Sequence, residues 1–210
     1  MTSRGLAVVI PAKDEGERIT ATVASALRIP EADLVMVVDD GSSDDTGRLA
    51  RAAGAQVISH PRNRGKAAAM TTGANAVRNR EVSDPDRLVD GVVAHRALLF
   101  IDADLEDSAI NTAPLAGPVV ADEADMTIAI LPPQKRSGGG FGFVVGLAAR
   151  GIRELSGFEA TQPLSGMRCL SQDAFQASQP FAHGWGVETA MTIDLVKAGH
   201  RGREAEREVQ

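Results

Sequence analysis

The sequence lacks several features that would assign it to common classes of protein. None of its 210 residues is a tyrosine and only one is a tryptophan, so the aromatic surfaces on which single-stranded nucleic acids stack are missing. The net charge of −6 lacks the basic footprint of a general nucleic-acid binder, so we expect no nucleic-acid partner. A single cysteine, Cys169, excludes an internal disulfide and is typical of a reducing cytoplasm.

Long hydrophobic runs and the commonest nucleotide-binding motifs are also missing. No apolar run approaches the roughly 20 residues of a membrane span, and no signal peptide precedes the first apolar run. We therefore expect a cytoplasmic protein. The sequence has no G-x-x-x-x-G-K-[ST] loop, which disfavours P-loop chemistry. It also has no G-x-G-x-x-G after the first apolar run, which disfavours a dinucleotide oxidoreductase.

What the sequence does contain predicts one α/β domain. Short continuous apolar runs alternate with amphipathic segments, and this order predicts right-handed βαβ units and a mostly parallel sheet flanked by helices. The predicted strands are 6–10, 34–38, 56–58, 97–101 and 126–131, with a further strand entered near 170 and an edge strand at 203–209. The predicted helices are 17–27, 46–53, 67–77, 108–121, 141–155 and 187–198. We expect residues 78–90 to form a polar, mobile segment.

The apolar run 97–101 leads straight into two carboxylates, Asp102 and Asp104. In open α/β sheets, ligands bind at the carboxyl ends of the strands. An Asp-x-Asp pair offers hard oxygen ligands to Mg²⁺ or Mn²⁺, which also bind substrate phosphates. The alternative is an acidic loop that caps the following helix.

Three further loops follow predicted strands and should lie at the same rim of the sheet. Residues 12–16 and 39–45 are acidic, whereas residues 60–66 carry arginine and lysine. Carboxylates for a cation beside basic side chains for phosphates suit a nucleoside diphosphate.

Four motifs occur in an order and approximate spacing that resemble glycosyltransferase family 2. They are V-I-P-A-K-D-E at 9–15, V-V-D-D-G-S-S-D-D-T at 37–46, N-R-G-K at 63–66 and D-A-D at 102–104. The segments P-L-S-G-M-R at 163–168 and G-W-G-V-E at 184–188 resemble the subgroup of dolichyl-phosphate mannose synthases, and glucosyl-3-phosphoglycerate synthases look more distantly similar. The resemblance covers nearly the whole chain and specifies neither donor nor acceptor.

This resemblance implies a GT-A fold and a metal-dependent transfer of a sugar from a UDP- or GDP-sugar. The acceptor would carry a phosphate or a hydroxyl group, and a polyprenyl phosphate is one such acceptor. Asp102 and Asp104 would hold the nucleotide and its Mg²⁺ or Mn²⁺, with Asp104 as the direct ligand. The implied nucleotide- and donor-binding residues are Pro11, Ala12, Glu15, Asp40, Lys66, Asp102, Ala103 and Arg168. Asp40 could also have a structural role at the turn around Gly41, and the two roles are compatible.

Glu188 stands at the start of a predicted helix, in the region that supplies the acid nearest the acceptor in this family. With a hydroxyl acceptor, Glu188 could remove the proton as general base. A phosphate acceptor is already ionised, so Glu188 would then orient it. The alternative is an acid that only complements the helix dipole. The expected catalytic residues are therefore Glu188 and Asp104.

The resemblance also suggests how the chain divides. Residues 1–131 would form the nucleotide-sugar-binding half of a single domain and residues 132–210 the acceptor-side half. The stretch Lys135 to Gly142 would close over the site, and Trp185 would be either a sugar platform or a core residue. Many relatives continue into a segment whose histidine can complete the metal site. This sequence ends at Gln210, so we expect either an incomplete metal site or a truncated polypeptide.

Several alternatives stay open. The amphipathic segment near Phe141 either packs on the core or contacts the inner face of the membrane peripherally, which would favour a lipid-phosphate acceptor. A homodimer is compatible with the sequence. A nucleotidyltransferase is disfavoured because residues 11–16 are acidic where such enzymes carry a basic, glycine-rich loop. A non-catalytic nucleotide-binding module would bind the nucleotide without turnover.

Overall fold

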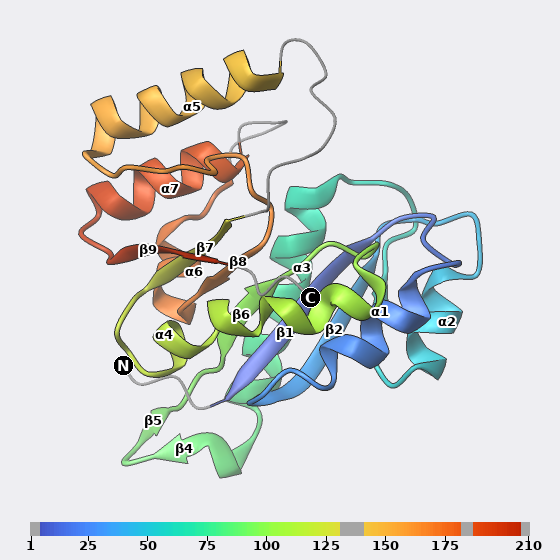
Figure 1. Cartoon of the computed structure of the whole chain (residues 1–210). Helices are drawn as coiled ribbons and strands as arrows, with labels where there is room; N and C mark the ends of the chain where they lie inside the picture. Colours follow the sequence, from blue (N-terminus) through green and yellow to red (C-terminus); the bar gives the residue numbers. More distant parts are fainter. Residues whose placement is uncertain (1–4, 131–140, 182–186, 207–210) are drawn as a thin grey trace.

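A mostly parallel sheet forms the centre of the protein (Figure 1). The computed structural model describes residues 5–130, 141–181 and 187–206. The sheet has the strand order β3-β2-β1-β6-β8-β7-β9, and only β8 runs antiparallel to its neighbours. Its strands are β1 (Leu6–Ala12), β2 (Ala32–Asp39), β3 (Gln56–Ser59), β6 (Ala97–Phe100), β7 (Met126–Ile130), β8 (Arg168–Leu170) and β9 (Gly202–Glu206). The predicted α/β fold is confirmed, with β9 at one edge as expected.

Helices cover both faces of the sheet. The first face carries α1 (Ile19–Ala26), α2 (Thr46–Ala52), the 3-10 helix η2 (Glu106–Leu115) and α4 (Gly117–Val120). The second face carries α3 (Lys66–Val82), α6 (Gln172–Ala177) and α7 (Val187–Lys197). Helix α5 (Phe141–Ser156) packs outside this layer, against α7 (Figure 1).

Strand β1 shows why the sheet is buried on both sides. Side chains alternate between the two faces of a strand, and all five residues from Leu6 to Ile10 are fully buried. Leu6, Val8 and Ile10 join the core under α1, while Ala7 and Val9 join the core under α3. A continuous apolar run is therefore required here, and it is the pattern from which the strand was predicted.

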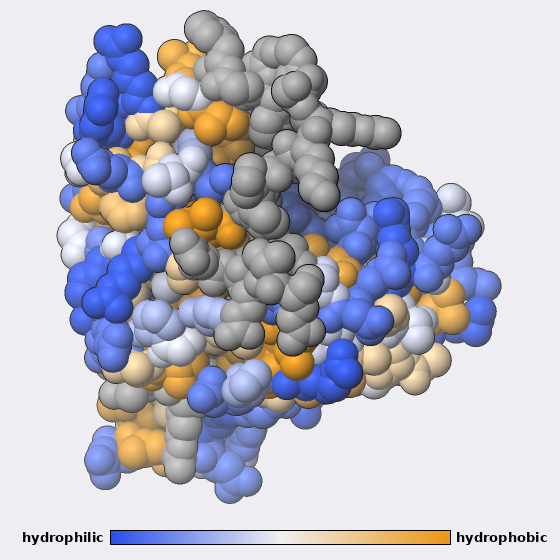
Figure 2. Space-filling model, viewed as in Figure 1, coloured by the Kyte–Doolittle hydropathy of each residue, from blue (hydrophilic) through white to orange (hydrophobic). Residues whose placement is uncertain are grey.

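The prediction for residues 78–90 was wrong. Helix α3 continues to Val82 and is followed by the 3-10 helix η1 (Pro85–Arg87) and a hairpin of β4 (Leu88–Val89) and β5 (Val92–Val93). The helix continues because Glu81 is fully buried and binds residues beyond the hairpin, a partnership that local polarity conceals. Figure 2 shows hydrophobic surface at the lower-left tip, where this hairpin protrudes.

Two other segments differ from expectation. The predicted helix 108–121 is instead η2 followed by the short α4, since Pro114 and Pro118 supply no backbone N–H to a continuous helix. Helix α6 was not predicted, because six residues are too few to show a helical period. Strand β8 enters the middle of the sheet in the antiparallel direction, a long-range placement that the order of elements does not reveal.

Candidate functional site

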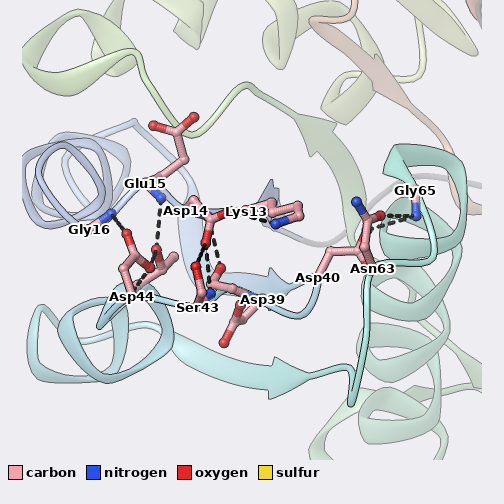
Figure 3. Close-up of polar contacts among 12 residues, drawn as sticks. Lys13, Asp14, Glu15, Gly16, Asp39, Asp40, Ser43, Asp44, Asn63 and Gly65 are labelled. Carbon is pink, nitrogen blue, oxygen red and sulfur yellow. Dashed lines mark hydrogen bonds and ion pairs between the residues drawn. The ribbon is translucent and has the colours of Figure 1, made fainter.

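The parallel strands β1, β2, β3 and β6 bring their carboxyl ends to one edge of the sheet, as the sequence predicts. The loops that follow them form a continuous rim. Two of these loops are joined by direct hydrogen bonds (Figure 3). Ser43 donates its backbone N–H and its hydroxyl to Asp14 Oδ1, at 2.7 and 3.0 Å, and Gly16 N donates to Asp44 Oδ2 at 2.9 Å.

Charge and hydrogen bonding stabilise the ionised form of Asp14. Lys13 Nζ lies 2.5 Å from its Oδ2. This bond, followed by the two bonds from Ser43, lowers the pKa of Asp14 to about 2. The backbone of Asp14 has a φ of 54°, a left-handed conformation that Asp tolerates better than most residues. The loop is therefore held in one shape by its own acid at neutral pH.

Asp40 is buried and holds the basic loop. Its side chain accepts hydrogen bonds from the backbone N–H groups of Arg64 (2.9 Å) and Gly65 (2.7 Å), and His60 Nδ1 lies 2.6 Å away. His60 Nε2 in turn lies 2.9 Å from Thr72 Oγ1 on α3. Asp40 is 4% exposed, and these contacts give it a structural role toward residues 60–65 rather than the turn at Gly41, while its contact with a nucleoside stays a prediction. No pattern in the sequence indicated these roles of His60 and Thr72.

We expect Asp40→Ala to lower the free energy of unfolding by about 3 kcal/mol, because two backbone donors and His60 lose a buried, charged acceptor. Asp45→Ala is the matched control: this exposed carboxylate pairs only with Arg48 in the described structure, so its loss should cost under about 0.5 kcal/mol. Urea unfolding measures both. A loss under about 1 kcal/mol for Asp40→Ala would contradict the structural role.

The acidic pair lies at the end of the central strand β6. Asp102 Oδ1 is 2.6 Å from Lys66 Nζ at the start of α3. Ala103 between the two acids is buried, and its carbonyl accepts a 2.8 Å hydrogen bond from Thr22 Oγ1. Asp104 is exposed, and within the described residues no hydrogen bond or ion pair occupies its carboxylate. The Asp102 carboxylate is thus paired with Lys66, whereas the Asp104 carboxylate is open.

Helix α1 braces the segment that carries this pair. Thr22 Oγ1 also accepts the N–H of Glu106 at 2.8 Å, and Ser25 Oγ donates to the Asp107 carbonyl at 2.8 Å. Both hydroxyl side chains are fully buried. They satisfy backbone groups that the irregular segment leaves unpaired. Their place among the apolar residues of α1 was the only signal in the sequence, and it did not reveal this role.

The acidic residues at this rim fit a divalent cation that is bound by substrate phosphates as well as by the protein. Among the described residues, no group of three or more His, Cys, Asp or Glu side chains could hold a metal ion. Asp102 and Asp104 can supply two carboxylates. Mg²⁺ is commonly bound in this way, through one or two carboxylates together with substrate phosphates and water. The open carboxylate of Asp104 is consistent with its expected role as the direct ligand.

The remaining donor residues lie on the same rim. Pro11 and Ala12 end β1, and the carbonyl of Ala12 accepts the N–H of Asp40 at 2.8 Å. Glu15 donates its N–H to Thr46 Oγ1 at 2.8 Å, and its carboxylate pairs with Arg18 at 2.6 Å. The structure thus brings Pro11, Ala12 and Glu15 to the rim, where their contacts with a nucleoside stay a prediction.

Arg168 is placed differently from expectation. It is fully buried in β8, and its Nη2 and Nη1 donate to the carbonyls of Ser165 (2.6 Å) and Glu188 (3.2 Å). Burial lowers the pKa of this guanidinium to about 10, and the negative charge of Glu188 opposes the shift. The Arg168 guanidinium therefore joins a loop to the first turn of α7 and presents no exposed face to a phosphate. Glu188 itself is half-buried in that turn.

Some expectations lie outside the described residues. These concern Lys135 and its neighbours up to residue 140, Trp185 and Gln210. A groove of about 340 Å³ lies on α5 and shares no residue with the rim; it is lined by Gly146, Ala149, Arg150, Arg153, Glu159 and Ala160. No helix in the described parts of the chain is long and apolar enough to span a bilayer.

The sheet and its rim define the class of protein. The structure is similar to a crystal structure of glucosyl-3-phosphoglycerate synthase from M. tuberculosis, with a TM-score of 0.73 and 26% identity over 99% of this chain and 73% of that chain. A structure of the Mycobacterium tuberculosis enzyme in complex with Mn²⁺, UDP and phosphoglyceric acid gives a TM-score of 0.72 at 26% identity, covering 98% of this chain and 69% of that one. The protein therefore has the GT-A fold.

The sequence comparisons name the family. Residues 7–144 match Glycosyl transferase family 2, and the chain belongs to that family. Glucosyl-3-phosphoglycerate synthase of Mycolicibacterium paratuberculosis is 29% identical over 217 residues, which cover 91% of this chain and 60% of that protein. The succinoglycan biosynthesis protein ExoU of Rhizobium meliloti is 46% identical over 67 residues, 30% of this chain and 20% of that protein. The chain thus spans 60% of the length of the mycobacterial relative.

Proposed function

We propose that the protein transfers a sugar from a UDP-linked donor to a phosphate- or hydroxyl-bearing acceptor, with Mg²⁺ or Mn²⁺ as cofactor. The observation that carries this proposal is the open carboxylate of Asp104 beside the Lys66–Asp102 pair, at the carboxyl end of the central strand. Carboxylates that could bind a cation and an ammonium group that could bind phosphates lie together there. UDP and Mn²⁺ in a structurally similar family member support the choice of donor and cofactor.

The proposed roles follow from placement. Asp102 and Asp104 would hold the cation, which would neutralise negative charge on the leaving diphosphate. The Lys66 ammonium would lie against the donor phosphates and balance the same charge. Pro11, Ala12 and Glu15, on the neighbouring loop, would bound the nucleoside. Residues 1–131 would then form the donor half of a single domain, and residues 132–210 the acceptor-side half.

Glu188 is the proposed general base on the acceptor side. It lies in the first turn of α7, on the helix that the buried Arg168 joins to the loop before β8. As a carboxylate it would take the proton of a hydroxyl acceptor as that oxygen attacks the anomeric carbon. With a phosphate acceptor no proton needs removal, and Glu188 would orient the acceptor instead.

A lipid phosphate is the acceptor that the surface of α5 favours. Leu147 and Leu155 on this helix are 61% and 57% exposed, and Arg150 and Arg153 lie near them in sequence. Exposed leucines beside basic residues suit the boundary between lipid headgroups and acyl chains. Phosphoglyceric acid, present in the structure of the similar mycobacterial synthase, is the comparison acceptor. A homodimer remains compatible with this proposal.

The donor is tested by thermal shift with UDP and GDP, each with Mn²⁺, Mg²⁺ or EDTA. We expect UDP to stabilise the protein only with a metal ion, by about 2.7 kcal/mol at a hundredfold excess over Kd. Turnover of UDP-sugars is then measured with a polyprenyl phosphate in vesicles and with 3-phosphoglycerate. Stabilisation by GDP but not by UDP would show that the donor is a GDP-sugar. Nucleotide binding without turnover of either acceptor would favour a non-catalytic module.

A further inference from the structure

Gly166 lies directly against the Lys66–Asp102 pair. A Cβ atom at this position would stand 2.5 Å from Lys66 Nζ and 3.6 Å from Asp102 Oδ1. The φ of Gly166 is outside the left-handed region, so its backbone conformation does not itself demand glycine. Glycine therefore matters here because of space: without a side chain, the backbone at residue 166 can approach the ammonium group closely.

The loop that carries Gly166 cannot easily retreat from this contact. Arg168 Nη2 binds the Ser165 carbonyl at 2.6 Å, and Ala129 N donates to the Met167 carbonyl at 3.0 Å. Arg168 is itself buried in a strand between β6 and β7. A side chain added at Gly166 would therefore be accommodated mainly by its flexible neighbour, the end of Lys66, whose side chain is 43% exposed.

We propose that Gly166 is a positioning residue of the donor site. Because glycine has no side chain, the Lys66 ammonium has room to pair with the Asp102 carboxylate. The buried Arg168 fixes the loop that carries the glycine. The consequence for donor binding rests on the proposed function, whereas the placement of Lys66 does not. The loop directly before β8 thereby acts on the donor site through Lys66.

The first test needs no ligand. In a crystal structure of the wild type, Lys66 Nζ should pair with the Asp102 carboxylate. In a crystal structure of Gly166→Ala, Lys66 Nζ should lie more than about 4 Å from that carboxylate. Gly117→Ala is the matched control, because a Cβ there meets no atom within 4 Å and its φ is also ordinary. Urea unfolding should give the same stability for both variants. An intact Lys66–Asp102 pair in Gly166→Ala would overturn the proposal.

The second test is a double-mutant cycle with Lys66→Ala, titrating UDP in the presence of Mn²⁺ by calorimetry. We expect Gly166→Ala to weaken binding about tenfold in the wild-type background, the scale of one charge-assisted hydrogen bond, and to have no effect once Lys66 is alanine. Equal losses in both backgrounds would show that Gly166 does not act through Lys66. If the wild type fails to bind UDP with Mn²⁺, the proposed donor fails, while the crystal structures still decide the role of Gly166.

Discussion

We expect Asp104→Ala to abolish the metal-dependent stabilisation by UDP and to lower turnover by about 10³-fold, the equivalent of several kcal/mol of charge stabilisation. Asp104 is exposed and has no partner among the described residues, so its contribution should be to the cation alone. The melting temperature of the free variant should therefore equal that of the wild type. Titration of Mn²⁺ with UDP, together with initial rates, measures the two effects.

Asp107→Ala is the matched control for this variant. Asp107 is also an exposed aspartate and follows Asp104 by three residues, but its described hydrogen bond is made by the backbone carbonyl. Its alanine variant should keep both metal-dependent binding and turnover. Asp102→Asn adds a second comparison, because the amide oxygen can still accept the bond from Lys66 while the negative charge is lost. Unchanged UDP affinity with Mn²⁺ in Asp104→Ala would contradict the assignment of the ligand.

The sequence was informative where one residue pattern had one structural meaning. Continuous apolar runs predicted strands buried on both faces, and the acids directly after them predicted a polar rim. Asp102 follows β6 and Asp40 follows β2, so both were placed at the correct edge of the sheet. The parallel topology then brought Lys66 to Asp102 across 36 residues of sequence. The location of the candidate site therefore followed from local pattern together with one topological rule.

The sequence was uninformative where a polar side chain finds its partner inside the protein. Asp40 and Arg168 look like surface charges, yet each is buried and binds backbone groups. Thr22 occupies a helix position that could equally face solvent, yet its hydroxyl forms hydrogen bonds with the backbone on both sides of Asp104. Such roles depend on which backbone groups a fold leaves unpaired, and these are known only when the loops have been placed.

The largest effect on stability should come from Glu81, which lies at the amino-terminal ends of the strands, whereas the candidate site lies at their carboxyl ends. This fully buried carboxylate accepts hydrogen bonds from Arg96 N (2.9 Å) and Nη1 (3.3 Å), and His95 Nδ1 lies 2.7 Å away. Asp33 at the start of β2 binds the same arginine at 2.6 and 2.8 Å and also Arg87 at 2.7 Å. The cluster ties α3 and the β4–β5 hairpin to the amino-terminal ends of the strands.

We expect Glu81→Ala to lower the free energy of unfolding by about 3–5 kcal/mol, because the N–H and Nη1 of Arg96 and the ring of His95 lose a buried acceptor, although Arg96 keeps Asp33. Glu81→Gln should lose less, since the amide oxygen can still accept from Arg96. Glu154→Ala, which removes an exposed carboxylate paired with Arg150, should change stability by under about 0.5 kcal/mol. Urea unfolding gives all three values.

This prediction also separates stability from function within one molecule. The Glu81 cluster and the rim lie at opposite ends of the same strands, so the folded fraction of Glu81→Ala should bind UDP and Mn²⁺ with the wild-type affinity. Asp104→Ala should show the reverse, with full stability and no metal-dependent binding. Loss of UDP affinity in folded Glu81→Ala would mean that strain passes along the sheet from one edge to the other. The two edges could then no longer be treated as independent.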